Sequence, residues 1–390
     1  MLVSHPLLLQ IFLGSEKYPY KGILDTLANR SFATGTNAWT ANDNTTYTVV
    51  RLAGPSGIGL RSLPSFLAAG NCWTRGFPEN PARIRRSRPL PVSFGLADRP
   101  LMPSNDPAHT VPSPTLASQQ ETLYSMKNAL RSETGGLLKA LRVLKVEEIR
   151  EYHGAMYVPQ NITINVAGRS LDPTKLLETL TEKVIPSIVE HKQNKGSRPP
   201  GWIRPFVESS TASNPPKIER DTTELVEFPE KDESVGELML SWIGVPHNDF
   251  LNDLALEVLG QYLTDSAVSP LYKEFVEIEE PACTDISFYS STADPTILTV
   301  YLSSVPAEQL NTLPQKFKDA LARIAKEGID MTRMTTILER QKLQLLNSME
   351  TDAAEVLSDV VVADAVYGAA DGKDLQTSLR VMSDYKTLDT

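Results

Sequence analysis

Apolar and polar positions alternate most clearly in the C-terminal half of the chain. Short apolar runs rich in strand-forming residues predict β-strands, and apolar residues that recur every three or four positions predict amphipathic helices. After the last predicted helix the chain is polar, and we expect no further strand there. The predicted strands are 237–243, 285–289 and 297–302. The predicted helices are an apolar one at 250–263, amphipathic ones at 307–326 and 334–349, and a last one at 353–367.

The N-terminal half has fewer periodic segments. Leucines recur at helical spacing at 137, 141 and 144, and a second helical pattern runs from Ile149 to Met156 and stops at Pro159. The alternating run Ile162–Val166 predicts a strand with one buried face. An aspartate and a proline at 172 and 173 are typical of a helix start, and this helix is expected to run to about residue 189.

Between Leu52 and Gln120 the periodicity is lost. Proline recurs throughout this segment, and four arginines cluster between Arg83 and Arg88. Because proline removes backbone donors, we expect no packed element here and interpret 52–120 as a disordered insert. The arginines favour a solvated loop over a nuclear-import signal. Translation of intron or shifted-frame sequence is a third interpretation. A polar, proline-bearing stretch at 191–217 marks a further boundary.

Length and composition are those of a globular protein with more than one domain. At 390 residues, 41% hydrophobic and 22% charged, the chain is long enough for two cores of ordinary size. Its net charge of -10 argues against nucleic acid and anionic membranes as main partners. Cys72 and Cys283 lie far apart and form no C-x-x-C pair, which favours a reducing compartment. We therefore expect a cytoplasmic location.

Several segments of the chain carry a family resemblance. They are 12–22, 24–30, 35–40, 131–136 and 151–161, and together they resemble the insulinase/pitrilysin (inverzincin) zinc metallopeptidases, in particular the presequence-protease-like branch. The resemblance implies an α+β fold of duplicated α/β units, each a mixed sheet with helices packed on one face, with the first unit incomplete here. It also offers a mitochondrial location as the alternative to the cytoplasm.

The catalytic motif of that family is broken in this sequence. The family has H-x-x-E-H on a helix, where two histidines bind zinc and the glutamate activates the metal-bound water. In the register of the resemblance these three positions are His5, Leu8 and Leu9. His5 is thus a vestigial ligand, while the general base and the second ligand are leucines. The resemblance implies zinc for the family, and we expect that it is not retained here.

One glutamate and four further histidines are candidate zinc ligands. Glu121 is the glutamate nearest to the place of the family's third ligand, but its surroundings do not match. The remaining histidines favour packing or loop roles over metal binding, and they are His109, His153, His191 and His247.

The apolar run at 1–13 has two interpretations. It can be a truncated catalytic helix or the core of a signal peptide. The missing basic leader and cleavage pattern favour the helix. No stretch reaches the roughly 20 apolar residues of a membrane span.

A stronger candidate site lies in the segment 36–48. Asn37, Ala38, Trp39 and Thr40 match a pattern that the family carries on a sheet-edge strand beside the zinc, where an extended substrate pairs with the strand. The resemblance therefore implies backbone binding of peptides with little regard to their sequence. The alternative is a plain β-strand in which Trp39 and Tyr47 pack into a core.

Pattern and resemblance together predict three regions. Residues 1–190 form a degenerate peptidase-like unit that includes the insert, 191–220 form a linker, and 221–390 form a second, noncatalytic unit. Two functions remain open. The favoured one is an inactive family member that binds peptides, unfolded polypeptide, a homologous peptidase chain or a second copy of itself. The other is an active zinc endopeptidase whose deduced sequence is truncated or mis-spliced.

Overall fold

The computed structural model describes about three fifths of the chain. Two compact units are present, an N-terminal unit of residues 1–104 and 132–204 and a C-terminal unit of residues 105–131 and 205–390. The main break between them, after Arg204, falls inside the predicted linker. The limits of the predicted regions themselves stay a prediction. The described residues are 33–51, 114–125, 128–132, 138–149, 152, 163–166, 172–186, 218, 221–227, 232–351, 353–369 and 371–388.

The N-terminal unit contains a β-hairpin. Strand β1 (Ala33–Thr40) pairs antiparallel with β2 (Thr45–Arg51), and Thr40 lies opposite Thr45 at the turn. The turn is closed by a bond from the Ala41 amide to the Asn44 carbonyl at 2.9 Å. Asparagine and aspartate favour such turns because their short side chains bond the local backbone and each other. A shift of register near Gly35 shows a bulge at the far end.

Helical residues follow in short pieces. They are α5 (Leu138–Leu141), a turn of helix at 146–149, α7 (Pro173–Thr179) and the π-helical η5 (Leu180–Val184). The predicted start of α7 is confirmed, because the Asp172 carboxylate accepts bonds from the amides of Thr174 and Lys175 at 3.1 and 3.2 Å.

The predicted strand at 162–166 is wrong for the residues that are described. Residues 163–166 have no regular structure, and Ile164 is 40% exposed. Alternation of apolar and polar residues makes a strand only where a partner strand and a core face are available. Residues 163–166 pair with no strand of the described chain.

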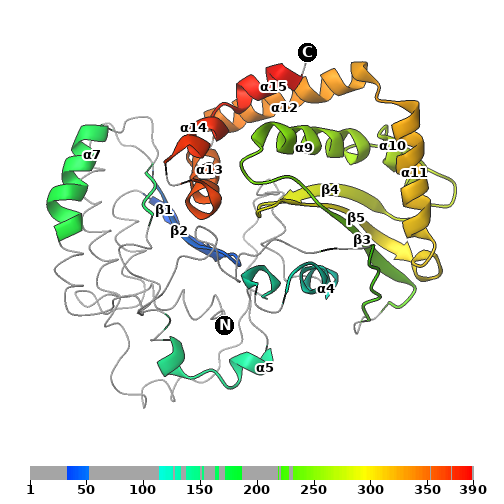
Figure 1. Ribbon diagram of the computed structural model, residues 1–390, viewed down its shortest axis with the longest axis horizontal. Helices are drawn as coiled ribbons and strands as arrows, with labels where there is room; N and C mark the ends of the chain where they lie inside the picture. Colours follow the sequence, from blue (N-terminus) through cyan, green and yellow to red (C-terminus); the bar gives the residue numbers. More distant parts are fainter. Residues whose placement is uncertain are drawn as a thin grey trace. The chain divides into compact units, whose positions relative to one another are not determined.

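The C-terminal unit is built on a three-stranded antiparallel sheet with the order β3-β5-β4 (Figure 1). The strands are β3 (Val235–Ile243), β4 (Asp285–Ser291) and β5 (Ile297–Pro306). These confirm the three predicted strands and extend each by a few residues. A bulge near Gly236 shifts the β3–β5 register, and Ser304 opposite it has a positive φ of 51°.

One face of this sheet is apolar and carries the core. Val300 and Leu302 of β5 and Ile286 of β4 are at most 4% exposed, and they pack with Phe317 and Leu313, which are fully buried. These last two residues belong to α11 (Leu313–Glu327). Side chains at alternate positions share a face, which explains why one face is apolar and the other rich in serine, threonine and tyrosine.

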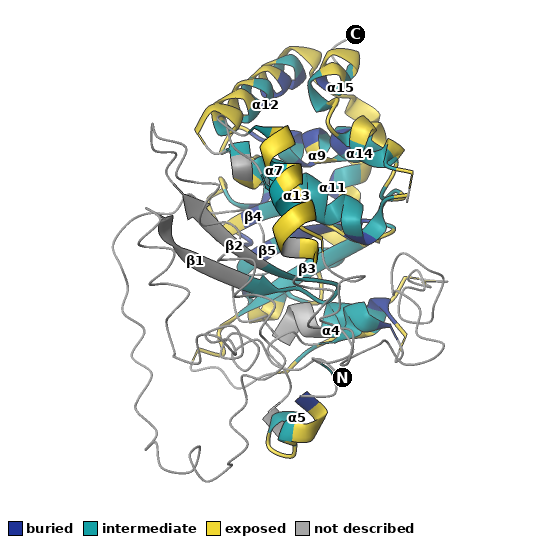
Figure 2. Ribbon diagram, turned by 90° about the vertical axis from the view of Figure 1, so that its left-hand side faces the viewer, coloured by how far each residue is buried: buried dark blue, intermediate teal, exposed yellow. Residues whose placement is uncertain are grey.

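The helix α9 (Phe250–Thr264) lies on the same apolar face. It approaches β4 so closely that a Cβ at Gly260 would lie 2.0 Å from the Phe288 ring, so only glycine fits there. On its outer side α9 carries a second core, with Leu254 and Val258 packed against Leu338. Figure 2 shows buried residues gathered on α9 and α12 and on the strands beneath them.

The remaining helices of the C-terminal unit complete these layers. The helix α13 matches its prediction in full, whereas the predicted helix 307–326 divides into η7 and α11, because Pro314 fits the first turn of a helix but not its interior. Three short helices, α10, α14 and α15, are not predicted by the sequence pattern. The elements are α10 (Pro270–Phe275), η7 (Ala307–Gln309), α12 (Met331–Thr351), α13 (Ala353–Tyr367), α14 (Lys373–Ser378) and α15 (Val381–Leu388).

A helix from the proline-rich segment lies on the opposite face of the sheet. This is α4 (Pro114–Leu123), followed by the short η3 (Ala129–Arg131), both in the C-terminal unit (Figure 1). The Gln119 side chain donates to the Thr299 hydroxyl of β5 at 2.9 Å and also to Ser241 of β3. Residues 114–120 therefore form a packed helix where the proline spacing predicts none, since Pro114 stands at the first helical position and no proline follows within α4.

The α+β class predicted for the chain is confirmed by these elements. Within the described residues, the sheets are antiparallel throughout, and helices lie on both faces of the larger one. None of the described helices combines the length and the apolar character that a membrane crossing requires.

Candidate functional site

The residues of the broken catalytic motif lie outside the described part of the chain. This holds for His5, Leu8 and Leu9, and equally for His109, His153 and His191. Across the residues that the structure does describe, no three or more His, Cys, Asp or Glu side chains are grouped to hold a metal ion. The assignment of His5 as a vestigial ligand stays a prediction.

The four predicted peptide-binding residues lie together on β1. Asn37, Ala38, Trp39 and Thr40 are the last four residues of this strand and pair in register with residues 48 to 45 of β2. Trp39 and Thr40 are half-buried, and the Thr40 and Thr45 hydroxyls lie 3.3 Å apart. Among the described strands, β1 pairs only with β2, so its second edge has no strand beside it there.

Such an edge has a definite chemistry. In an antiparallel pair, alternate residues direct both their N–H and C=O groups toward the partner strand, and the residues between them direct these groups away. An extended peptide can bond to the outward groups and add a strand to the sheet. An edge of this kind can hold a segment through its main chain, with little contribution from the segment's side chains.

Glu121 has a structural role. It lies on α4 with an exposed side chain and forms an ion pair with Arg131 at 3.3 Å. The Arg131 guanidinium also donates to the Tyr124 carbonyl at 3.0 Å, so the pair ties the end of α4 to η3.

His247 lies at the end of the larger sheet, before the start of α9. Its half-buried ring packs against Phe250 and Tyr367, with centroid distances of 5.8 and 5.2 Å. Its backbone amide donates to the Asp294 carboxylate at 3.1 Å. Burial lowers the pKa of His247, against the opposing effect of Asp294 and three further aspartates nearby. The predicted loop role next to a helix start is confirmed.

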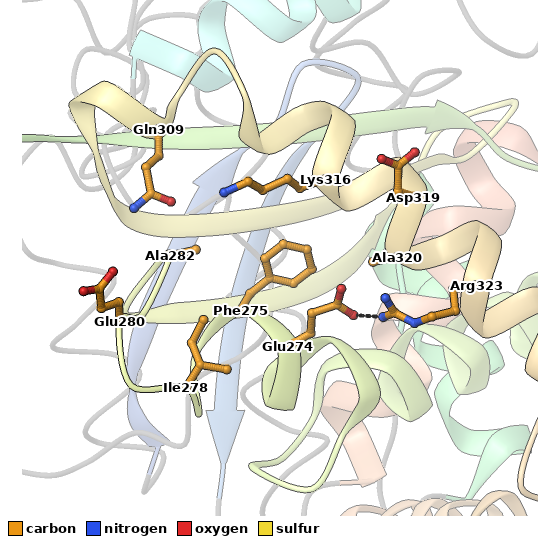
Figure 3. A pocket seen from close by; sticks show the side chains of 10 residues that line it. All are labelled: Glu274, Phe275, Ile278, Glu280, Ala282, Gln309, Lys316, Asp319, Ala320 and Arg323. Carbon is orange, nitrogen blue, oxygen red and sulfur yellow. Dashed lines mark hydrogen bonds and ion pairs between the residues drawn. The ribbon is translucent and has the colours of Figure 1, made fainter.

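A pocket that the sequence reading did not find lies between α10 and α11 (Figure 3). Its volume is about 380 Å³. The floor is formed by Phe275, Ala282 and Ala320, which are 3%, 6% and 0% exposed. Charged side chains stand around it, and Figure 3 shows Glu274 and Arg323 joined in an ion pair at one end.

One signal in the sequence could have indicated this pocket. The turn after α10 reads Glu277-Ile278-Glu279-Glu280-Pro281, which places three carboxylates around an isoleucine that is 42% exposed. A single exposed apolar side chain is ordinary on a protein surface, so the signal lies in the run of carboxylates around it. The pocket itself depends on α11, which lies more than thirty residues further along the chain.

Comparison with known proteins gives a consistent family. The family model described as "Peptidase M16 inactive domain" matches residues 144–341. The "Uncharacterized protein YOL098C" of Saccharomyces cerevisiae is 34% identical over 388 residues, covering 97% of this chain and 35% of the relative. The mitochondrial presequence protease of Xenopus tropicalis is 23% identical over 366 residues, covering 88% of this chain and 33% of the relative.

Among solved structures, a protease from Helicobacter pylori has a similar fold. The TM-score is 0.62 at 13% sequence identity, with 99% of this chain and 85% of that chain covered. At this identity the likeness concerns the fold alone. The chain spans about a third of the length of the curated relatives that it matches first.

Proposed function

The chain belongs to the peptidase M16 family, and from that membership we propose that it is a noncatalytic member that binds extended peptide segments along β1. The observation that carries this proposal is the position of the four matched residues, Asn37 to Thr40, on a strand that lacks a described neighbour on one side. The bound segment is unfolded polypeptide or an extended segment of a homologous chain.

The proposed lack of catalysis follows from the side chains at the three positions of the zinc-binding motif. Zinc in proteins is held by imidazole nitrogen, thiolate sulfur or carboxylate oxygen, and a catalytic site needs three such ligands. At the three motif positions this chain offers one imidazole, from His5, because the side chains of Leu8 and Leu9 have no donor atom. The residues present do not fit a catalytic zinc ion, and no proton acceptor stands at the position of the general base.

Backbone pairing explains how such a chain would still bind peptides. Each strand residue added to an edge contributes main-chain hydrogen bonds, and these do not depend on the metal. The hairpin turn is fixed by its own bonds, among them the 3.0 Å bond from the Thr46 hydroxyl to Asn44. A preformed strand of this kind lowers the ordering cost of binding.

The test is the binding of a labelled, unstructured peptide, followed by fluorescence anisotropy and amide hydrogen exchange. We expect the amides of β1 to exchange more slowly in the complex. The same peptide N-methylated at alternate residues has lost the donors on one of its edges, and we expect it to bind at least tenfold more weakly, since several main-chain bonds of about 1 kcal/mol each are lost. Equal affinity of the two peptides, or unchanged exchange across 33–40, would contradict the proposal.

A substitution in the strand gives a second readout. The backbone N–H groups of adjacent strand residues point in opposite directions. Of the two variants Asn37→Pro and Ala38→Pro, one therefore removes an N–H group at the open edge of β1, and the other removes a hydrogen bond between β1 and β2. We expect one of the two variants to keep the exchange pattern of the hairpin while losing the peptide.

The second candidate function is an active zinc endopeptidase. It is favoured by the similarity to a presequence protease over 88% of this chain. Hydrolysis of a quenched peptide by the 390-residue chain, sensitive to a chelator and lost in His5→Ala, would establish it. We expect no such hydrolysis and no stoichiometric zinc after dialysis, because a single ligand binds zinc only weakly.

A further inference from the structure

The pocket between α10 and α11 is separate in sequence from β1 and from the catalytic motif. It lies entirely in the C-terminal unit, and its volume of about 380 Å³ falls in the range of ligand pockets, roughly 300–1,000 Å³. The buried side chains of Phe275, Ala282 and Ala320 form its floor. Ile278 adds an exposed apolar wall, so an apolar occupant would remove this surface from water.

Among the charged groups around the floor, acidic side chains outnumber basic ones. Glu274 and Arg323 neutralise each other as an ion pair. Of the other lining residues, Glu280 and Asp319 are acidic and Lys316 is basic. Asp319 accepts a hydrogen bond from Gln315 at 2.8 Å, and among the described residues Glu280 has no ion-pair partner.

The turn beside the pocket adds to the excess of negative charge. Glu277 and Glu279 flank the pocket wall and are exposed, while the opposite wall, α11, presents Lys316 as its one lining cation outside the Glu274–Arg323 pair. The formal charge of these groups is therefore negative, which disfavours a phosphate or carboxylate ligand. Figure 3 shows Glu280 on one side of the floor and Asp319 on the other, with Phe275 between them.

We propose that this pocket binds a basic and apolar peptide segment, in which an arginine beside an apolar residue lies over Phe275 and reaches Glu280. An arginine side chain suits the site because its methylene stem covers apolar surface while its planar guanidinium pairs with a carboxylate through two parallel bonds. The apolar neighbour of the arginine packs against Ile278. The segment belongs to a partner protein, and the site is independent of the edge-strand proposal for β1.

The experiment uses the full 390-residue chain and two labelled hexapeptides, one alternating leucine and arginine and one alternating leucine and glutamate. Fluorescence anisotropy at low ionic strength measures their affinities. We expect the arginine peptide to bind and the glutamate peptide to bind at least tenfold more weakly. In Glu280→Lys an attraction becomes a repulsion, so we expect the arginine peptide to bind about tenfold more weakly.

Glu279→Lys is the matched control. It makes the same change of charge one residue away, in the same exposed turn, at a residue that does not line the pocket. We expect at most about a twofold loss of affinity in this variant, the size of a weak, screened surface effect. Ile278→Ser, at an exposed position, tests the apolar wall and is expected to weaken binding without unfolding the chain.

Three results would overturn the proposal. The first is a lack of binding of the arginine peptide to the wild-type chain. The second is equal weakening by Glu279→Lys and Glu280→Lys, which would show a general attraction to the acidic turn. The third is unchanged binding in both Glu280→Lys and Ile278→Ser, which would place the peptide elsewhere, for example on β1.

Discussion

The two antiparallel sheets in the described part of the chain differ in what their side chains do. In the C-terminal unit, β5 presents Val300 and Leu302 to a core that α9, α10 and α11 complete. In the N-terminal unit, β1 has the sequence ATGTNAWT, with one large apolar residue, Trp39. A two-stranded hairpin gains little from burial and is marginal by itself, whereas a sheet with a covered apolar face is stable. The larger sheet is thus a folding scaffold, whereas β1 is the strand that carries the proposed peptide site.

The largest effect is expected where the core of the scaffold is removed. Phe317 is fully buried, with ring centroids 5.9 Å from Phe275 and 6.2 Å from Trp242. Phe317→Ala should lower the free energy of unfolding of the C-terminal unit by about 3–5 kcal/mol, because transfer energy and cavity cost add. Urea unfolding followed by hydrogen exchange in α9 and β5 measures this change.

The matched substitution in the other region is Trp39→Ala. Trp39 is half-buried and belongs to the N-terminal unit, so we expect α9 and β5 to keep their protection from exchange in this variant. A loss of that protection comparable to the loss in Phe317→Ala would show that the two regions fold as one, and the comparison would fail.

A smaller effect is expected at the back of the sheet. Gln119→Ala removes the bonds from α4 to Thr299 and Ser241 and should destabilise the docking of α4 by about 1 kcal/mol, the usual net value of a neutral hydrogen bond. Faster amide exchange in α4, with β5 unchanged, is the expected measurement. Gln120→Ala, at the adjacent glutamine, is the control. If it loosens α4 as much as Gln119→Ala, helix propensity rather than docking is the cause.

The smallest effect concerns pH. Burial lowers the pKa of His247 in the folded chain, so below the ordinary value of about 6.5 the unfolded chain binds a proton that the folded chain does not. The stabilising contribution of His247 is therefore fully present above its ordinary pKa and is lost as the pH falls toward its lower pKa in the folded chain. His247→Phe keeps an aromatic ring between Phe250 and Tyr367 and removes the titration.

We expect the His247→Phe variant to lose less stability than the wild-type chain between pH 7 and pH 5, measured by urea unfolding at each pH. Four aspartates face this histidine and oppose the effect of burial on its pKa, namely Asp253, Asp294, Asp364 and Asp374. Identical pH dependence of the two chains would show that His247 is not desolvated.

Long periodic segments were predictable, and short ones were not. The pattern predicted α9 and α13 nearly to the residue, because each is a run of 15 residues in which apolar positions recur through the whole helix. The same reasoning predicted a strand at 162–166 that is absent from the described residues, because its alternation is only five residues long. It also missed α4, since the surrounding prolines masked a segment of ten residues without an internal proline.

The two candidate sites also differ in whether the sequence could predict them. Asn37 to Thr40 could be found because a contiguous sequence pattern marks them, and the structure places all four on one strand. The pocket could not, because Glu280 and Phe275 meet Asp319 and Ala320 only through the packing of α11 beside α10. No local pattern relates residues that lie about forty positions apart.

The sequence by itself determined the fold class, the larger elements and the family resemblance, because each depends on residue type and local spacing. Only the tertiary structure decided that α4 covers the polar face of the sheet through Gln119 and that an acidic turn and α11 enclose a pocket. Both depend on contacts between distant segments, whose free energy arises from burial and hydrogen bonding after the chain has closed on itself.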